Sequence, residues 1–464
     1  MNKKSIAIIG AGISGLAAGF FIRQKYGDAV RLTIYEKDSR PGGTIGTTRE
    51  KGFLVDWGAN GFLDREPLTL DFIEQIGLSD KLYRANDKSN KRFIYRNGRL
   101  WEISPHPVKF MTSGLLSLKG RLRIAGEYFV PPKRTDEDES IFDFAARRIG
   151  REAAEILIDP MVSGIYGGDA GALSLRACFP VMEKMERQYG GLIRAMIRKK
   201  KECKTIGNSE GGPAGPAGRL TSFKGGLYTI IEHLANMLEE HIRFSTDLEN
   251  IIRTTDGKYN IKINGNREIH DIIIMAVPSY AAAKLLEGIE PDVSRLLEKI
   301  PYSNLAVVCQ GYEADKIERP LDGFGFLVPH NQNLNILGSI WTSVIFPEQA
   351  PKGQALFRTM LGGALNNAIV DKDENSLAET TSNELGRIMG IREKPVYQKV
   401  FVWKKAIPQY ISGHSQLVKD IEQGLEKPGN IYLAGNAYSG IGLNDSVKRS
   451  YNIVNNFIPP AQLL

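Results

Sequence analysis

The chain has 464 residues, of which 42% are hydrophobic and 24% are charged, a composition typical of a soluble protein with more than one core. Its net charge of +7 would suit a nucleic-acid ligand, but the sequence holds no zinc-finger spacing and no aromatic–basic RNA motif, so we expect no nucleic-acid partner. No apolar run reaches the roughly 18 residues that a membrane-spanning helix needs.

The first residues predict a strand, a helix and a second strand. "SIAIIG" reads as a buried strand, a helix follows over about 14 to 26, and "RLTIYE" forms a strand that ends at Glu36. This order predicts a βαβ unit, in which two parallel strands are joined by a helix.

The turn between the first strand and the helix carries a phosphate-binding pattern. Gly10, Gly12 and Gly15 form G-x-G-x-x-G. The first glycine allows a tight turn, the second lets the backbone approach a pyrophosphate, and the third lets helix and strand pack closely. Glu36 lies 21 residues after Gly15, where a carboxylate can accept hydrogen bonds from an adenosine ribose. Together these residues predict a dinucleotide site.

The loop that follows Glu36, "EKDSRPGGTIGT", indicates which dinucleotide binds. It resembles the second phosphate-side motif of the FAD-binding amine oxidase superfamily, in which an arginine and paired glycines wrap around the flavin. The resemblance assigns Lys37, Arg40, Gly42 and Gly43 to FAD. The superfamily pattern usually ends in arginine, and Thr44 stands there in this chain.

The middle third of the chain is basic. Between Lys91 and Arg134 there are ten basic residues against two acidic ones, and "RKKKECK" follows at 198 to 204. Both runs alternate with apolar pieces, a pattern that suits an anionic membrane surface but equally a solvated basic face. A Gly/Pro-rich linker is expected at 208 to 218.

Helix and strand patterns return after this linker. "GGLYTIIEHLANMLEE" predicts an amphipathic helix, and residues 242 to 265 predict strands with a turn at Asp256 and Gly257. "DIIIMAVP" predicts a core strand. From about 300 to 410 we expect short strands mixed with helices.

The tail, "IYLAGNAYSGIGLNDSVKRSYNIV", predicts a strand that ends at Gly435 and a helix that starts near Asn444. In FAD oxidases of this architecture a helix N-terminus points at the flavin pyrimidine edge, where its partial positive charge stabilises the reduced ring. The resemblance therefore assigns Gly435, Gly442, Leu443 and Asn444 to FAD.

The tail and the segments "SGIYGGDAGALSLRACFP", "GFGFLVP" and "TMLGGA" together resemble the protoporphyrinogen oxidase family nearly from end to end. That family implies a flavoenzyme of haem biosynthesis. Noncovalent FAD removes hydrogens from protoporphyrinogen IX and passes the electrons to dioxygen, which gives the porphyrin and hydrogen peroxide. A coproporphyrinogen III oxidase of the same fold, another flavin amine oxidase or desaturase, and an FAD-binding protein without turnover are the alternatives.

The resemblance also implies the substrate contacts. Arg92 matches a position that pairs with a substrate propionate. Phe324 and Leu327 match positions that sandwich a pyrrole ring. Met360 matches a position beside the active face of the flavin, and Gly164 matches a glycine whose carbonyl faces the substrate centre. The family often has an arginine where Ser163 stands, and some members have one in place of Asn60. The remaining FAD contacts that it implies are Ile13, Ser14, Gly58, Ala59, Asn60 and Leu248.

No catalytic side chain and no metal site is expected. The six histidines show no ligand spacing, and the flavin carries the chemistry. Cys178, Cys203 and Cys309 are far apart and fit no disulfide framework, which indicates a reducing, cytoplasmic setting.

The expected fold is α/β, with a Rossmann-like FAD-binding domain interleaved with a mixed-sheet substrate domain and a helical, membrane-facing domain. We expect the FAD domain at 1–85, 222–290 and 412–464, the substrate domain at 86–105 and 291–411, and the helical domain at 106–221. Peripheral membrane contact on the cytoplasmic face and a homodimer are left open.

Overall fold

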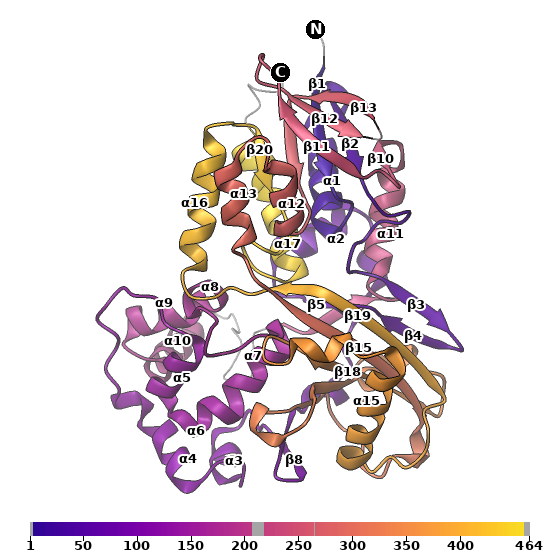
Figure 1. Cartoon of the computed structure of the whole chain (residues 1–464). Coiled ribbons are helices and arrows are strands. Elements are labelled where there is room, and N and C mark those ends of the chain that lie inside the picture. The colour runs from indigo at the N-terminus through magenta and orange to yellow at the C-terminus, as the bar shows by residue number, and fades with distance from the viewer. Residues whose placement is uncertain (1–2, 207–217, 264, 459–464) are drawn as a thin grey trace.

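The structure is a computed structural model that describes residues 3–206, 218–263 and 265–458. A five-stranded parallel sheet forms the upper end of the molecule in Figure 1. Apart from Gly218, the expected linker at 208 to 218 lies outside the described residues. In spatial order the strands are β10 (Ile242–Arg243), β2 (Val30–Tyr35), β1 (Lys4–Ile9), β14 (Ile272–Met275) and β20 (Ile431–Leu433). The expected βαβ unit and core strand are therefore confirmed.

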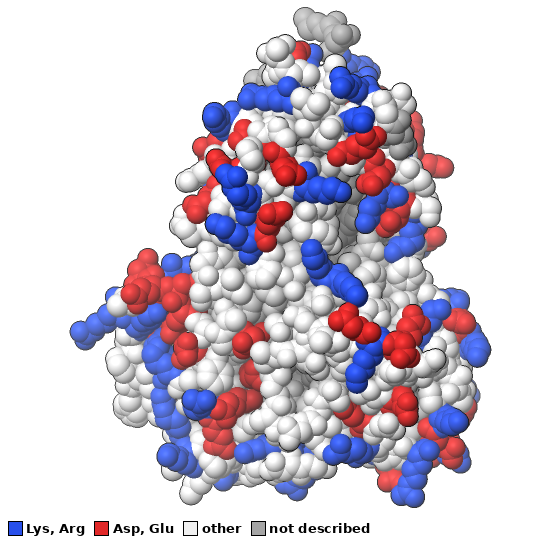
Figure 2. All heavy atoms as spheres, in the orientation of Figure 1, with Lys and Arg blue, Asp and Glu red and all other residues white. Residues whose placement is uncertain are grey.

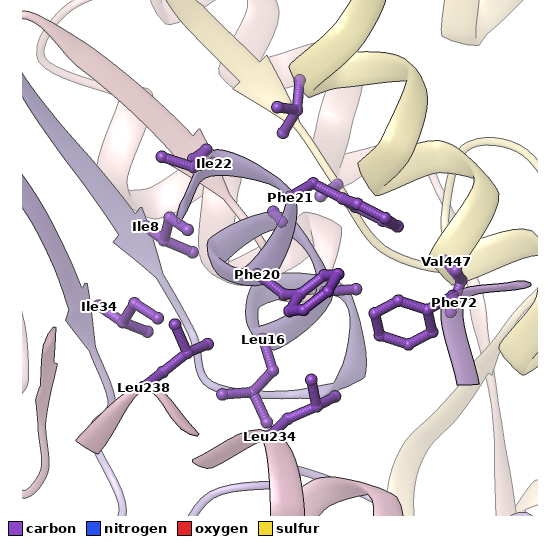
Figure 3. Packing of buried hydrophobic residues seen from close by; sticks show 14 of the residues in the cluster. Ile8, Leu16, Phe20, Phe21, Ile22, Ile34, Phe72, Leu234, Leu238 and Val447 are labelled. Carbon is purple, nitrogen blue, oxygen red and sulfur yellow. The ribbon is translucent and has the colours of Figure 1, made fainter. Parts of the chain in front are cut away.

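One face of this sheet is covered by helices that come from both ends of the chain. Helix α1 lies at the centre, and Gly19 lets it approach the sheet, because a Cβ there would lie 2.9 Å from the side chain of Ile34. Figure 3 shows Phe20 and Phe21 of α1 packed beside Phe72 and Val447. The helices on this face are α1 (Ile13–Tyr26), α2 (Pro67–Gln75), α11 (Tyr228–Met237) and α17 (Leu443–Asn452).

The other face is covered by a three-stranded antiparallel sheet and three helices. The expected turn at Asp256 and Gly257 joins the first two strands of that sheet, and Gly257 has a φ of +79°. The covering elements are β11 (Leu248–Arg253), β12 (Tyr259–Ile263), β13 (Asn266–His270), α12 (Ser279–Leu286), α13 (Pro291–Glu298) and α16 (His414–Glu426).

A seven-stranded mixed sheet forms the second layer system, below the parallel sheet in Figure 1. Only β16 and β7 run parallel within it. The expectation of short strands is wrong for β15 and β19, which have 12 residues each because they pair along nearly their whole length. In spatial order the strands are β19 (Tyr397–Pro408), β15 (Tyr302–Glu313), β18 (Gln354–Gly362), β17 (Ile336–Trp341), β16 (Gly325–Leu327), β7 (Phe93–Arg96) and β8 (Arg99–Glu102).

Helix α15 (Glu374–Met389) packs on one face of the mixed sheet, and the short α14 (Thr342–Ile345) follows β17. Two further small sheets are present among the described residues. They consist of β3 (Thr47–Glu50) with β4 (Phe53–Asp56), and of β5 (Phe62–Leu63), β9 (Leu220–Phe223) and β6 (Leu82–Arg84).

Residues 107–206 form a group of helices at the lower left of Figure 1. Arg96 of the mixed sheet connects to this group, because its guanidinium lies 3.4 Å from Glu152. The helices are α3 (Pro107–Thr112), α4 (Leu118–Ala125), α5 (Ile141–Ile149), α6 (Arg151–Ala153), α7 (Asp159–Tyr166), α8 (Leu175–Cys178), α9 (Pro180–Tyr189) and α10 (Leu192–Ile206). The boundaries of the three expected domains stay a prediction.

Candidate flavin and substrate site

The predicted dinucleotide residues gather at the carboxyl edge of the parallel sheet. Gly10 follows β1, Glu36 follows β2 and Gly435 follows β20 by two residues. Gly10 has a φ of +100°, and a Cβ on it would lie 2.6 Å from the carbonyl oxygen of Ala276, the residue after β14. This edge is where parallel sheets bind nucleotides.

Glu36 and the loop after it are tied to the glycine turn. The Glu36 carboxylate accepts hydrogen bonds from the backbone N–H of Ala11 at 2.7 Å and from that of Asp38 at 3.0 Å. Gly42 N–H donates to the Ala11 carbonyl at 2.8 Å, and Thr246 N–H donates to the Glu36 carbonyl at 2.8 Å. The second contact brings the start of β11, with Leu248, to the same edge.

The tail reaches this edge as expected, with one correction. Strand β20 ends at Leu433 rather than at Gly435, because Gly435 has a φ of +117° and turns the chain. Helix α17 lies against α1, where Ser450 Oγ donates to the Ser14 carbonyl at 2.8 Å. Asn444 Nδ2 donates to the Leu63 carbonyl at 2.9 Å, which places the N-terminus of α17 beside the segment after Asn60.

A side chain two residues beyond the end of β19 holds the glycine-rich tail loop. Tyr410 Oη donates to the Asn436 carbonyl at 2.5 Å and accepts from Gly440 N–H at 2.8 Å. Gly442 N–H donates to the Asp445 carboxylate at 3.0 Å. The sequence alone did not single out Tyr410, because its partners lie more than 25 residues further along the chain.

The residues of this region fit a bound FAD. A Cβ on Gly12 or on Gly43 would meet nothing within 4 Å, so both glycines border open space. Asn60 Nδ2 and Asn444 Oδ1 are buried, and neither has a hydrogen-bond partner among the residues that the structure describes. A polar ligand would satisfy such atoms, since an unpaired buried donor or acceptor is costly.

An aromatic stack that the sequence did not predict joins the loop after Glu36, and the loop of residues 57–60, which we call the flavin loop, to the mixed sheet. The Arg40 guanidinium lies 4.2 Å from the ring centroid of Trp57, and Trp57 stacks on Phe401 at 5.7 Å between centroids. Trp403 Nε1 donates to the Trp57 carbonyl at 3.2 Å. Trp57 stands in "DWGANGF", a loop for which the sequence pointed only to the residues after it.

Two of the predicted substrate residues, Leu327 and Met360, lie on one face of the mixed sheet. Leu327 of β16 pairs with Gly338 of β17, which pairs with Met360 of β18. Met360 then pairs with Val307 of β15, and Val307 with Phe401 of β19. Directly opposed residues point to the same side of a sheet, so a continuous row runs from the aromatic stack to Leu327.

Gly164 closes the far end of this row. It lies in α7, and a Cβ on it would lie 2.6 Å from Cδ2 of Leu327. The absence of a side chain at Gly164 therefore gives Leu327 room to lie against the backbone of α7.

Asp159, at the start of the same helix, contacts His330 at 2.6 Å, and this contact raises the pKa of His330 above its ordinary 6.5.

Arg92 and Phe324 lie together beside this row. Phe324 N–H donates to the Lys91 carbonyl at 2.8 Å, and the Arg92 guanidinium lies 5.3 Å from the Phe324 ring centroid. Desolvation lowers the pKa of Arg92. Lys91 pairs with Asp322 at 2.6 Å, whereas Arg92 has no ion-pair partner within the described ranges. Arg92 is therefore a cation with no anionic partner in this structure.

Several known proteins are similar to this chain over nearly its whole length. Protoporphyrinogen oxidase 1 of Arabidopsis thaliana chloroplasts is 31% identical over 474 residues, which cover 97% of this chain and 88% of that protein. Coproporphyrinogen III oxidase of Bacillus subtilis is 29% identical over 460 residues, which cover 96% of each chain. The crystal structure of a candidate protoporphyrinogen oxidase from Exiguobacterium sp. 255-15 matches with a TM-score of 0.84 at 26% identity, over 98% of this chain and 99% of that one.

A family model places the chain among flavoproteins. Residues 13–451 match the model described as flavin containing amine oxidoreductase. The flavin of that family, together with the dinucleotide turn and Glu36, identifies FAD as the cofactor. The chain therefore belongs to the flavin-containing amine oxidoreductase family.

Proposed function

We propose that the protein oxidises a porphyrinogen, protoporphyrinogen IX, to the porphyrin with dioxygen as the electron acceptor. The observation that carries this proposal is the row from Gly164 through Leu327 and Met360 to the aromatic stack beside the flavin loop. The apolar row suits the pyrrole rings of a large macrocycle, and the unpaired Arg92 beside it suits a carboxylate of that macrocycle.

The side chains of this site bind and orient more than they react. FAD, when bound, supplies the two-electron oxidation chemistry. Arg92 would hold a propionate in a fixed direction, and Phe324 and Leu327 would form the apolar wall. The row residues named above include no group that titrates near neutral pH, so rate enhancement would come from placing the reacting carbon against the flavin and excluding water.

The choice between two porphyrinogens depends on how many cations face the site. Coproporphyrinogen III has four propionates, whereas protoporphyrinogen IX has two. Arg319 packs over Phe93 and Trp341, in the cluster that α15 covers. Arg358 is buried and donates to the Gly58 carbonyl. Arg92 is then the one of these three arginines that is free to bind a propionate, which favours the substrate with fewer carboxylates.

A substrate comparison tests the proposal. Anaerobic addition of protoporphyrinogen IX should bleach the yellow flavin, and air should restore the colour. Side-by-side values of kcat/KM for protoporphyrinogen IX and coproporphyrinogen III, in the same detergent, decide between the two substrates. A clear preference for coproporphyrinogen III, the substrate named for the Bacillus subtilis relative, would replace our choice. A flavin that neither porphyrinogen bleaches would refute the proposal.

We also propose that the helical group lies on an anionic membrane surface. Among the described helices none is long and apolar enough to cross a bilayer. Val108 is 77% exposed and Phe129 79%, and Leu118 and Leu122 stand exposed on α4 beside Lys119. Figure 2 shows basic side chains down the left edge of this part, next to uncharged surface. Apolar side chains flanked by cations are typical of helices that insert shallowly into lipid.

Liposome binding tests this contact. Binding to vesicles with anionic lipid should weaken as salt rises, because charges at the surface are screened. Phe129→Ser should weaken binding at every salt concentration, and Ile252→Ser is the control, since Ile252 is also exposed but lies on β11. Absence of binding to anionic vesicles at low salt would refute the contact.

A further inference from the structure

A buried arginine lies between the mixed sheet and the flavin loop. Arg358 belongs to β18, two residues before Met360, so both side chains point to the same face of the sheet. It pairs with Cys309 on one side and with Ile340 on the other. Only 6% of its surface is exposed, although a charged arginine is rarely buried without a partner.

The partners of Arg358 are few. Its guanidinium donates to the Gly58 carbonyl, while its Nε has no hydrogen-bond partner in the described part of the chain. No carboxylate lies within ion-pair distance of it there, although Asp56 lines the same small hollow. Asp56 is itself occupied by Thr47 at 2.6 Å and by the backbone N–H of Leu227 at 3.0 Å.

Burial shifts the pKa of both groups. It lowers the pKa of Arg358 and raises the pKa of Asp56 to about 6. A buried cation without an ion pair costs several kcal/mol in general. The charge of Asp56 acts on Arg358, but the two groups form no salt bridge, so the contact of Arg358 with a backbone carbonyl needs another explanation.

That explanation lies in the loop that it contacts. Two successive carbonyl oxygens of the loop are held by side chains of the mixed sheet, the Trp57 carbonyl by Trp403 and the Gly58 carbonyl by Arg358. Asn60, whose buried Nδ2 lacks a partner, lines the hollow together with Arg358. The loop thus takes its position from the sheet that carries Met360 and Leu327.

We propose that Arg358 is a positioning residue for FAD. It holds Gly58, and through it Ala59 and Asn60, at a set distance from the mixed sheet, so that the flavin loop and the substrate row keep one geometry. The proposal concerns the cofactor site and does not depend on which substrate the enzyme oxidises.

The test compares Arg358 with a second arginine of the mixed-sheet layer. Arg319 is also partly buried, its Nε also lacks a partner, and it packs on aromatic rings away from the loop. Holoprotein is stripped of FAD, and the FAD dissociation constant of each variant is measured by quenching of flavin fluorescence. The melting temperature of each apoprotein and the visible spectrum of each reconstituted protein are recorded alongside.

Arg358→Met should raise the FAD dissociation constant about tenfold, since one charge-assisted contact is lost. Arg358→Lys should recover part of this loss and the shape of the flavin absorption band, because an ammonium can still donate to the Gly58 carbonyl. Arg319→Met should lower the melting temperature of the apoprotein but leave the dissociation constant unchanged.

Two results would overturn the proposal. One is an unchanged dissociation constant in Arg358→Met, or in Arg358→Gln if the methionine variant does not fold. The other is an equal loss of FAD affinity in Arg319→Met, which would show that any damage to the mixed sheet weakens the cofactor site.

Discussion

Replacing Gly164 by alanine should disturb the substrate site more than it disturbs the fold. The new Cβ would lie 2.6 Å from Cδ2 of Leu327 and 3.8 Å from Cδ1, so the leucine must leave its present rotamer. Moving one terminal methyl costs about 1 kcal/mol. A Cβ on Gly338 would lie 3.1 Å from the same Cδ2, so the leucine also lies close to the backbone of β17, and a new rotamer would change the apolar surface that the row offers to the substrate.

The expected result is a split between stability and kinetics. Gly164→Ala should lower the melting temperature by only a few degrees. It should reduce kcat/KM for the porphyrinogen about tenfold or more, since small misplacements of a substrate are costly in rate. Steady-state kinetics and thermal melts of the same FAD-loaded preparations measure both.

A double mutant supplies the control. Leu327→Val removes both Cδ atoms, so it should relieve the clash, and Gly164→Ala should cost little in the Leu327→Val background. Unchanged kinetics in Gly164→Ala would refute the reasoning. A loss that Leu327→Val does not reduce would mean that Gly164 acts through its backbone carbonyl rather than through space for Leu327.

Four further outcomes are expected. Arg92→Ala should raise KM for the porphyrinogen, with partial recovery in Arg92→Lys, because an ammonium lacks the planar fork of a guanidinium; equal KM values in all three proteins would place Arg92 outside the site. Glu36→Ala should weaken FAD binding about tenfold or more by fluorescence titration, because the ribose loses a carboxylate partner. Arg148 is fully buried with Glu127 and also contacts Glu186 at 3.1 Å. Arg148→Met should therefore lower the free energy of unfolding by about 3 to 5 kcal/mol in denaturant melts, and a change below about 1 kcal/mol would contradict this. Asp159 raises the pKa of His330 above 6.5. The pair therefore stabilises the fold below pH 6.5, and this contribution is lost as pH rises through the raised pKa. His330→Gln should accordingly lower the melting temperature at pH 6 but hardly at pH 9.

Local sequence pattern predicted the dinucleotide-binding unit closely. Helix α1 runs from Ile13 to Tyr26, against an expected start near residue 14. Gly10 has the positive φ that its place in the turn requires. These features depend on contacts between neighbours along the chain, and for that reason periodicity and glycine spacing reveal them.

The family resemblance pointed to substrate residues that composition alone would class as ordinary core. Phe324, Leu327 and Met360 are types that any interior uses, and the structure brings Leu327 and Met360 into one row by strand pairing. Their roles toward a substrate stay a prediction, as do the FAD contacts of the individual residues assigned above.

The sequence by itself determined the glycine turn, the carboxylate that follows the second strand and hence the class of cofactor. Only the tertiary structure showed that Arg358 reaches Gly58, 300 residues earlier, and that Phe401 stacks on Trp57. Contacts over such separations arise from the pairing of β15 with β18 and β19. That pairing depends on how whole layers bury their apolar faces, and short stretches of sequence do not record it.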